Sequence, residues 1–586
     1  MTRTSKKTRI MKKHFIAVCV LASLGVFAQG DDKDKKQVGS VEINVIDSYK
    51  ASVKQAVKIS RQPDFKDTVT KKLPVNYSIR SQSLDFHYNP KAIPAAKIKR
   101  TRLPKLPQNM ITLGFGTGLT PLAEIYTGSS RNKNSGWGAH ARYFSTQGGV
   151  KGIIYDKAPY RESEIDLYYK HIYKKYRIVA DLDANFDKSS YYGMMTDALP
   201  EGYTDELEFR NYNRFGGQFL IENINSKSRA VFRSAAVNYH YLMDNYNTTE
   251  HALYIPTKWL FKVQDEDIYT DFKVNYQKSA FGIDSINMLA GDTGTSPSFL
   301  QVQFMPKIKS NVGRLFFTVG LNINTNSETR TFANPTGKTR VYFFPELTAD
   351  IAIVPSVLAA YTGWIGSLTN NSIWSLKNEN PYINTFTNMQ ATSENRIYAG
   401  VKGKITNNLV YNVQAKYLLV DNMALFYRSP LTYASSKGFE VLYDDAQVIS
   451  LFGEVKLETS IALDIAGFFQ YDSYNMKNYA HAYHMPNLKT GIIATYNWKE
   501  KIVLTTNFAY VGERTAFDHS LFENGTTTEY PILKGYVDLR LGAEYRYNDD
   551  LSAFINVTNL LSQNYQTWYS YPTQQIRFLM GLTYRF

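Results

Sequence analysis

The chain ends on Phe578-Leu579-Met580-Gly581-Leu582-Thr583-Tyr584-Arg585-Phe586, in which every even-numbered residue is apolar or aromatic. Side chains two residues apart share one face of a β-strand. The even-numbered residues would form an apolar face, while the odd-numbered ones are mostly small or polar. This pattern predicts a final strand whose two faces meet chemically different surroundings.

The composition separates this chain from an ordinary soluble protein of 586 residues. Tyr (44) and Phe (33) are abundant, and the mean hydropathy is −0.34. Beyond the amino terminus no apolar run reaches the roughly 18 residues that a membrane-spanning helix needs. A barrel that alternates lipid-facing and lumen-facing residues has this composition.

The first 28 residues read as a secretory signal. Lys12 and Lys13 precede the apolar run 15–27, and Ala28 supplies a small residue for cleavage. A membrane anchor is the disfavoured alternative, because the run is short. Cys19, the only cysteine, lies inside the run, so we expect no disulfide in the mature chain. The signal also holds six of the Lys and Arg residues and no acid, and the weakly basic remainder does not indicate nucleic-acid binding.

Residues 29–107 differ from the rest of the mature chain and predict a short periplasmic segment or a reduced plug. Val41, Ile43 and Val45 alternate with polar residues like a short strand. The stretch 94–107 mixes basic residues with prolines, so it is interpreted as an extended connector. It is either solvated or held by a phosphate-rich lipid surface or an acidic partner.

From residue 108 to 586, strand-like segments follow one another to the end. A water-soluble sandwich also alternates, so periodicity does not decide the fold. Connection lengths do, because short links such as 174–175 and 499–501 tend to alternate with long ones such as 368–395 and 512–528. We therefore predict an all-β fold, a transmembrane antiparallel barrel of about 22 strands in the outer membrane of a Gram-negative bacterium.

The carboxyl end is similar to a known family. The run 551–569, in which Asn559-Leu560 precedes a Tyr-containing loop, and the terminal strand ending in Phe586 resemble the last two strands of TonB-dependent receptors. Glu379-Asn380-Pro381-Tyr382 resembles a loop element of the Bacteroidetes members. The resemblance covers the barrel, about four fifths of the chain.

The amino-terminal part departs from that family. Its receptors carry a plug domain inside the barrel, whereas residues 31–107 are short and residues 41–107 contain no glycine. The resemblance implies a TonB box near the mature amino terminus, and Val41, Ile43 and Val45 form the candidate. We expect a member that lacks a full plug.

Motifs for chemistry are weak, and we expect no enzyme, no cofactor and no metal site. A Ser/His or Asp/His catalytic constellation is not recognisable in the sequence. His481 and His484 are three residues apart, but two ligands without a third are more often ordinary loop histidines.

Aromatic clusters in the long loops are the candidate ligand-binding residues. Tyr and Trp combine a large apolar face with a polar tip, which suits recognition. An interfacial aromatic girdle is the alternative for residues near strand ends. The candidates are Tyr191, Tyr192, Tyr479, Tyr483, Trp568 and Tyr569.

Two functions remain open at this point. The first is receptor-like uptake of an unknown ligand, in contact with outer-membrane lipid and coupled to TonB. The second is a plugless barrel that serves as a scaffold for a partner protein of an envelope assembly or secretion complex. A barrel this wide leaks unless its lumen is closed. We expect residues 31–107, the loops or a partner to close it.

Overall fold

The structure is a computed structural model of the whole chain, and it describes residues 107–129, 132–193, 206–225, 231–263, 266–282, 296–329, 337–384, 389–428, 438–459, 462–518, 522–523, 526–527 and 530–586. The predicted signal peptide, the candidate TonB box and the rest of residues 1–106 lie outside the described residues. Their expected roles stay predictions.

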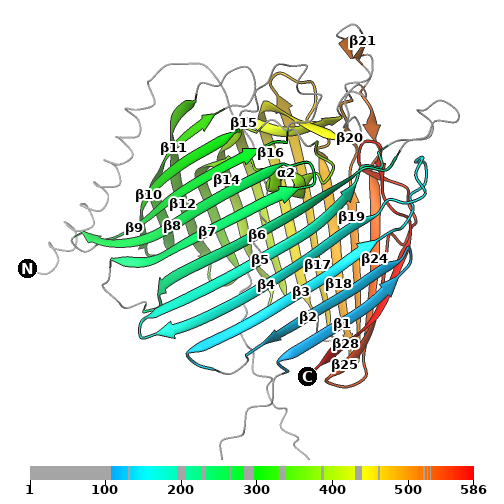
Figure 1. The fold of residues 1–586 in the computed structure, drawn as a ribbon. Helices are drawn as coiled ribbons and strands as arrows, with labels where there is room; N and C mark the ends of the chain where they lie inside the picture. Colours follow the sequence, from blue (N-terminus) through cyan, green and yellow to red (C-terminus); the bar gives the residue numbers. More distant parts are fainter. Residues whose placement is uncertain are drawn as a thin grey trace, which may run out of the picture. The chain divides into compact units, whose positions relative to one another are not determined.

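Twenty-two antiparallel strands form one closed sheet (Figure 1). The first eleven strands are β1 Asn109–Gly116, β2 Thr120–Gly128, β3 Ser135–Thr146, β4 Tyr160–Tyr173, β5 Tyr176–Ser190, β6 Phe209–Asn223, β7 Phe232–Asp244, β8 Thr249–Val263, β9 Glu266–Ala280, β10 Ser298–Val312 and β11 Leu315–Thr329. The second eleven are β12 Lys338–Val354, β13 Leu358–Asn370, β14 Ala391–Thr406, β15 Leu409–Arg428, β16 Phe439–Glu458, β17 Leu463–Met476, β18 Leu488–Trp498, β19 Ile502–Val511, β24 Tyr536–Arg546, β25 Leu551–Thr558 and β28 Arg577–Arg585. The predicted fold and strand number are confirmed.

Smaller elements lie in the long loops. The helix α2 spans Ile373–Glu379, and the short strand pairs are β20 Arg514–Thr515 with β23 Ile532–Leu533, β21 Phe522–Glu523 with β22 Thr526–Thr527, and β26 Gln566–Trp568 with β27 Tyr571–Pro572. Among the described residues, α2 is too short and too polar to be a membrane-spanning helix.

The barrel closes where the last strand pairs with the first. Leu582 of β28 lies opposite Leu113 of β1, and Thr583 lies opposite Thr112. The Oγ1 atoms of the two threonines are 3.0 Å apart and hydrogen-bonded in a buried position. The carbonyl oxygen of Phe586 accepts the backbone N–H of Asn109 at 3.0 Å. Closure leaves no open sheet edge. An open edge would expose unpaired backbone N–H and C=O groups to the bilayer, where nothing can satisfy them.

Tight turns lie at one end of the barrel and long loops at the other (Figure 1). Residues 499–501 join β18 to β19, and Lys499 and Glu500 have φ values of 52° and 60°, the left-handed conformation found in tight hairpin turns. The carboxyl terminus lies at the short-turn end. In an outer-membrane barrel the short turns are periplasmic and the long loops extracellular.

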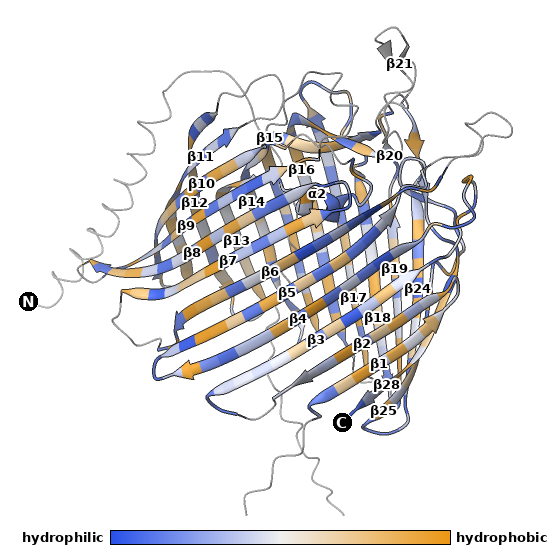
Figure 2. Cartoon of the chain, in the orientation of Figure 1, coloured by the Kyte–Doolittle hydropathy of each residue, from blue (hydrophilic) through white to orange (hydrophobic). Residues whose placement is uncertain are grey.

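The last strand has the two faces that its sequence predicts. Phe578, Met580, Leu582 and Tyr584 are 39–57% exposed, whereas Thr583 is 8% exposed. Figure 2 shows the same alternation of hydrophobic and hydrophilic residues around the wall. Apolar side chains that are exposed in a regular band are the lipid-facing residues of such a barrel.

Candidate functional site

The long loops pack together at the long-loop end and form what we call the lid. The lid consists of the described parts of the loops at 147–159, 191–193, 371–390, 477–487, 512–518 and 559–576. Buried apolar side chains from these loops and from the ends of neighbouring strands form two clusters. The first holds Ile153, Ile373, Leu376, Ile383 and Tyr571, and the second holds Tyr483 and Phe517. The loops are therefore a packed layer, each contacting its neighbours.

The helix α2 is fastened to the inner wall at both ends. Ser372 caps its first turn in a capping box. A carboxylate oxygen of Glu250, on β8, accepts the N–H of Ile373 at 2.7 Å, which places negative charge at the positive end of the helix dipole. The ammonium group of Lys377 pairs with the carboxylate of Asp187 on β5. The loop between β13 and β14 is thereby held against β8 and β5, which are several strands away in the sheet.

Arg210 of β6 binds the segment after the helix. Its Nη1 donates to the carbonyl oxygens of Ile383 and Asn384 at 3.0 and 2.8 Å. Its Nη2 lies 2.7 Å from Oδ2 of Asp244, and both side chains are fully buried. The hydroxyl of Tyr191 donates to the same Ile383 carbonyl at 2.6 Å. A buried charge is tolerated only when it is paired and hydrogen-bonded, as it is here.

Two further arginines tie loops to each other. Nη2 of Arg428 donates to the Gly193 carbonyl at 2.8 Å, and its Nη1 bonds the Ser570 hydroxyl. Nη1 and Nη2 of Arg514 donate at 2.7 Å to the carbonyls of residues 567 and 566. Each guanidinium thus donates to a backbone carbonyl of a loop that is distant in the chain.

Tyrosines fill the middle of the lid. The rings of Tyr382 and Tyr571 stack with centroids 3.8 Å apart, and Tyr192 meets Tyr571 edge-on at 5.0 Å. The Tyr192 hydroxyl lies 3.1 Å from that of Tyr382 and donates to the Pro572 carbonyl at 3.1 Å. Burial raises the pKa of Tyr382 to about 12 and that of Tyr192 above its usual range. These phenols stay neutral hydrogen-bonding groups.

The structure brings most of the predicted aromatic residues into the lid. Tyr192, Trp568 and Tyr569 belong to the first cluster, and Tyr483 belongs to the second. Tyr191, Tyr192 and Tyr483 are buried, while Tyr479 is 37% exposed. Sequence reasoning thus found residues that meet in space, and their role in binding a ligand stays a prediction.

His484 is a core residue of the lid. Its Nδ1 lies 3.1 Å from the Phe426 carbonyl and its Nε2 lies 3.4 Å from the N–H of Tyr569. This pattern fits the neutral ring with its proton on Nδ1. Burial lowers the pKa of His484 to about 3. Within the part of the chain that the structure describes, no cluster of three metal-ligating side chains occurs.

A polar cavity of about 700 Å³ lies between the lid and the inner wall. Trp374, Lys377 and Tyr382 of the lid border it, and Arg142 and Glu164 border it from the wall. Arg142 lies 3.7 Å from Glu162 and 4.0 Å from Glu164. The cavity is therefore lined by both positively and negatively charged side chains.

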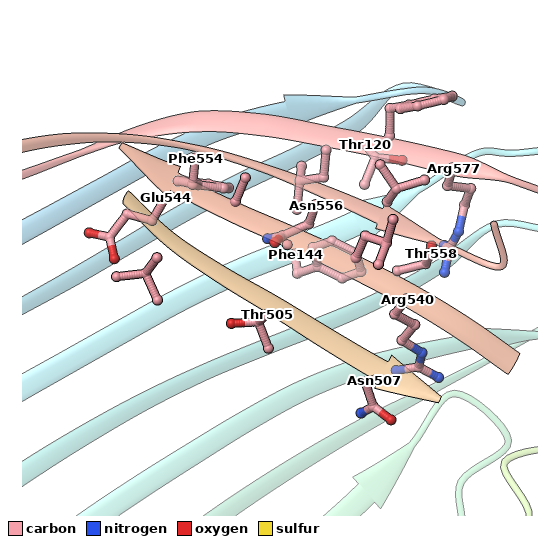
Figure 3. A pocket seen from close by; sticks show the side chains of 17 residues that line it. Thr120, Phe144, Thr505, Asn507, Arg540, Glu544, Phe554, Asn556, Thr558 and Arg577 are labelled. Atoms are coloured by element: carbon pink, nitrogen blue, oxygen red, sulfur yellow. The ribbon is translucent and has the colours of Figure 1, made fainter. Parts of the chain in front are cut away.

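A second cavity of about 430 Å³ runs along the wall formed by β19, β24, β25 and β28 (Figure 3). Thr505, Phe554 and Asn556 line it. Arg540, Thr558 and Arg577 line both cavities, so these three residues mark where the two spaces adjoin.

Sequence reasoning missed the charged residues of this site. Polar positions facing the lumen are visible in the strand pattern, for example Arg540 beside apolar Leu539 and Leu541. The partners of Arg210, Arg428 and Lys377 are far away in the chain, and only the register and the loop folding bring them together.

Comparisons with solved structures place the fold among outer-membrane receptors. The FrpB iron transporter of Neisseria meningitidis superposes with a TM-score of 0.62 at 10% identity, over 83% of each chain. The ferric-catecholate import receptor Fiu of E. coli has a TM-score of 0.60 at 11% identity, over 82% of each chain. The pyoverdine receptor FpvA of Pseudomonas aeruginosa has a TM-score of 0.59 at 13% identity, over 83% of this chain and 80% of that one.

The chain has a TonB-dependent-receptor-like barrel. This barrel is an outer-membrane fold. The similar structures are named as transporters and receptors, and one is a complex of FpvAI with pyocin S2. At 10–13% identity the likeness concerns the fold. The sequence matches no family profile and no curated protein.

Proposed function

We propose that the protein takes up a ligand across the outer membrane through a barrel whose long-loop end is closed by its own lid. The observation that carries this proposal is the packed lid with a polar cavity of about 700 Å³ on its inner side. A barrel of 22 strands encloses more space than its wall side chains fill. A lid that seals the end while leaving a hollow behind it suits a gated uptake path.

The contacts of the lid favour a reversible gate. Arg210 and Lys377 hold it through ion pairs and hydrogen bonds, with no covalent link in the described residues. We propose that a signal from the periplasmic side, delivered to Val41, Ile43 and Val45 by TonB, loosens these contacts. The names of the similar structures refer to ligands of those proteins and not of this chain. The ligand of this chain is therefore to be identified by experiment.

A reversible disulfide tests whether the lid must move. Ile383 and Phe439 form a parallel β-bridge, which brings their Cα atoms within the range of a disulfide. Cys19, the one native cysteine, lies in the predicted signal peptide. We expect Ile383→Cys with Phe439→Cys to block uptake when oxidised and to restore it on reduction. Each single cysteine variant is the matched control.

The nutrient is found by growth of a deletion strain on media that each limit one iron, phosphorus or carbon source. Uptake predicts a growth defect on one source, which the wild type and each single-cysteine variant complement and which the double-cysteine variant complements only when it is reduced. Growth without any defect, together with stoichiometric envelope proteins bound to the purified barrel, would overturn uptake in favour of the scaffold.

A second arm tests closure itself. Replacing residues 373–384 by a Gly-Ser linker of equal length removes α2 and its side-chain contacts, and we expect sensitivity to vancomycin to rise. Unchanged vancomycin sensitivity in a correctly inserted barrel would show that the lid does not close the lumen.

A further inference from the structure

The strand register places two arginines on either side of one threonine. Arg577 of β28 lies opposite Thr558 of β25. Leu541 of β24 lies opposite Val557, so the preceding Arg540 comes next to Thr558 from the other side. Neighbouring strands are about 4.8 Å apart, which puts the backbones of the two arginines about 10 Å apart. Figure 3 shows Thr558 between the side chains of Arg540 and Arg577.

All three side chains face the lumen. They line the cavity beneath the lid and the smaller cavity along the wall. The lipid-facing residues of β28 are the even-numbered ones, such as Phe578 and Met580, which leaves Arg577 on the opposite face. A solute that moves from one cavity to the other passes this trio.

The trio carries positive charge that the described residues do not neutralise. Nη1 of Arg577 donates to the Tyr160 hydroxyl at 3.1 Å and to Oε1 of Gln574 at 2.9 Å, and both acceptors are neutral. Arg540 uses Nε and Nη2 on Asp538, at 2.8 and 2.6 Å, and its side chain is still 56% exposed. The two guanidinium groups thus have one paired carboxylate between them, that of Asp538, and it contacts Arg540.

The other cations that border the cavity beneath the lid are differently placed. Arg142 has Glu162 and Glu164 within 4.0 Å, and Lys377 has Asp187. Arg161 and Lys188 also border this cavity, where they lie opposite each other on β4 and β5. Arg540 and Arg577 are therefore the cations that stand where the two cavities adjoin.

We infer that Arg540, Thr558 and Arg577 form an oxyanion site on the luminal wall. A guanidinium presents paired N–H donors that match a carboxylate or phosphate group, and a hydroxyl between two such groups adds another donor. Pores and clefts lined with uncompensated arginines favour anions. Resting on the proposed uptake, the inference adds that the solute carries a carboxylate or phosphate group.

Binding is measured on the full-length protein in neutral detergent by titration calorimetry at low salt, with inorganic phosphate and with citrate as probes. We expect the wild type to bind one or both, and Arg577→Gln or Arg540→Gln to weaken binding about tenfold or more. Arg577→Lys retains the charge and should bind more tightly than Arg577→Gln. The stronger probe distinguishes a phosphate site from a carboxylate site.

Arg585→Gln is the matched control. Arg585 belongs to the same strand, but it lies 3.6 Å from Glu544 near the short-turn end. Its loss should leave binding unchanged. The site would be overturned if the wild type bound neither probe, or if Arg577→Gln and Arg540→Gln bound the probes as tightly as the wild type does. An Arg585→Gln variant that lost as much affinity as Arg577→Gln would also overturn it. Binding needs no transport, so failed uptake would not affect this result.

Discussion

Arg210 and Asp244 form a fully buried ion pair at the long-loop end of adjacent strands β6 and β7, with Nη2 and Oδ2 2.7 Å apart. The same guanidinium holds two carbonyls of the lid. The Arg210 guanidinium thus connects the barrel wall, through Asp244, to the lid, through the two carbonyls.

The first prediction concerns this pair. Asp244→Leu leaves the Arg210 guanidinium buried without its carboxylate, and we expect the free energy of unfolding to fall by about 3–5 kcal/mol. Urea titration of the full chain in detergent micelles measures it. Glu222→Leu is the control, because its pair with Arg177 is 35–42% exposed and such pairs contribute about 1 kcal/mol or less. Equal losses in both variants would contradict a special role for the buried pair.

The second prediction uses neighbouring residues on opposite faces of β19. Leu504 is 43% exposed on the lipid side, whereas Thr505 lines the smaller luminal cavity. We expect Leu504→Arg to cost about 2–4 kcal/mol if it lies near the midplane, because a charge enters the hydrocarbon layer. Thr505→Arg should change stability little. Similar damage from both substitutions, measured by assembly in cells and by urea titration, would mean that both faces of β19 are buried in protein.

The third prediction concerns pH. The pKa of His484 is lowered from 6.5 to about 3 in the folded lid, so the unfolded chain binds a proton that the folded lid does not. Stability contributed by neutral His484 is therefore full above pH 6.5 and is lost as the pH falls below it, by up to about 1.4 kcal/mol per pH unit.

Hydrogen exchange of the lid amides between pH 7.5 and 5 measures this effect after correction for intrinsic exchange rates. His484→Asn should be less stable at pH 7.5 but should lose the His-dependent part of the pH slope. The Thr505→Arg variant, altered away from the lid, should keep that slope. An unchanged slope in His484→Asn would assign the pH dependence to another group.

The fourth prediction concerns a close approach in the lid. A Cβ atom on Gly193 would lie 2.6 Å from Cζ of Tyr571, which is itself stacked on Tyr382. We expect Gly193→Ala to displace the Tyr571 ring and to destabilise the lid by about 1–3 kcal/mol. Gly453→Ala is the control, because nothing lies within 4 Å of its added Cβ. Exchange of the Ser570 amide reports on the lid, and equal rates in the two variants would contradict the prediction.

The sequence by itself determined the barrel. Side-chain period and connection length are local properties, so the faces of Leu582 and Thr583, the turn at Lys499 and Glu500 and the number of strands were all readable from the chain. The sequence of a membrane-spanning strand must alternate between apolar and polar residues, because each side chain faces either lipid or the lumen.

Only the tertiary structure decided how the loops close the long-loop end. Arg210 meets Ile383 and Asn384 across more than 170 residues of chain, and His484 meets Phe426 across 58. Neither contact has a periodic signal, since each depends on where a loop returns. The predicted loop aromatics Tyr192 and Tyr483 appeared as candidates because aromatic residues are visible in any sequence. Their burial in the lid follows from packing between distant loops, which no local pattern encodes.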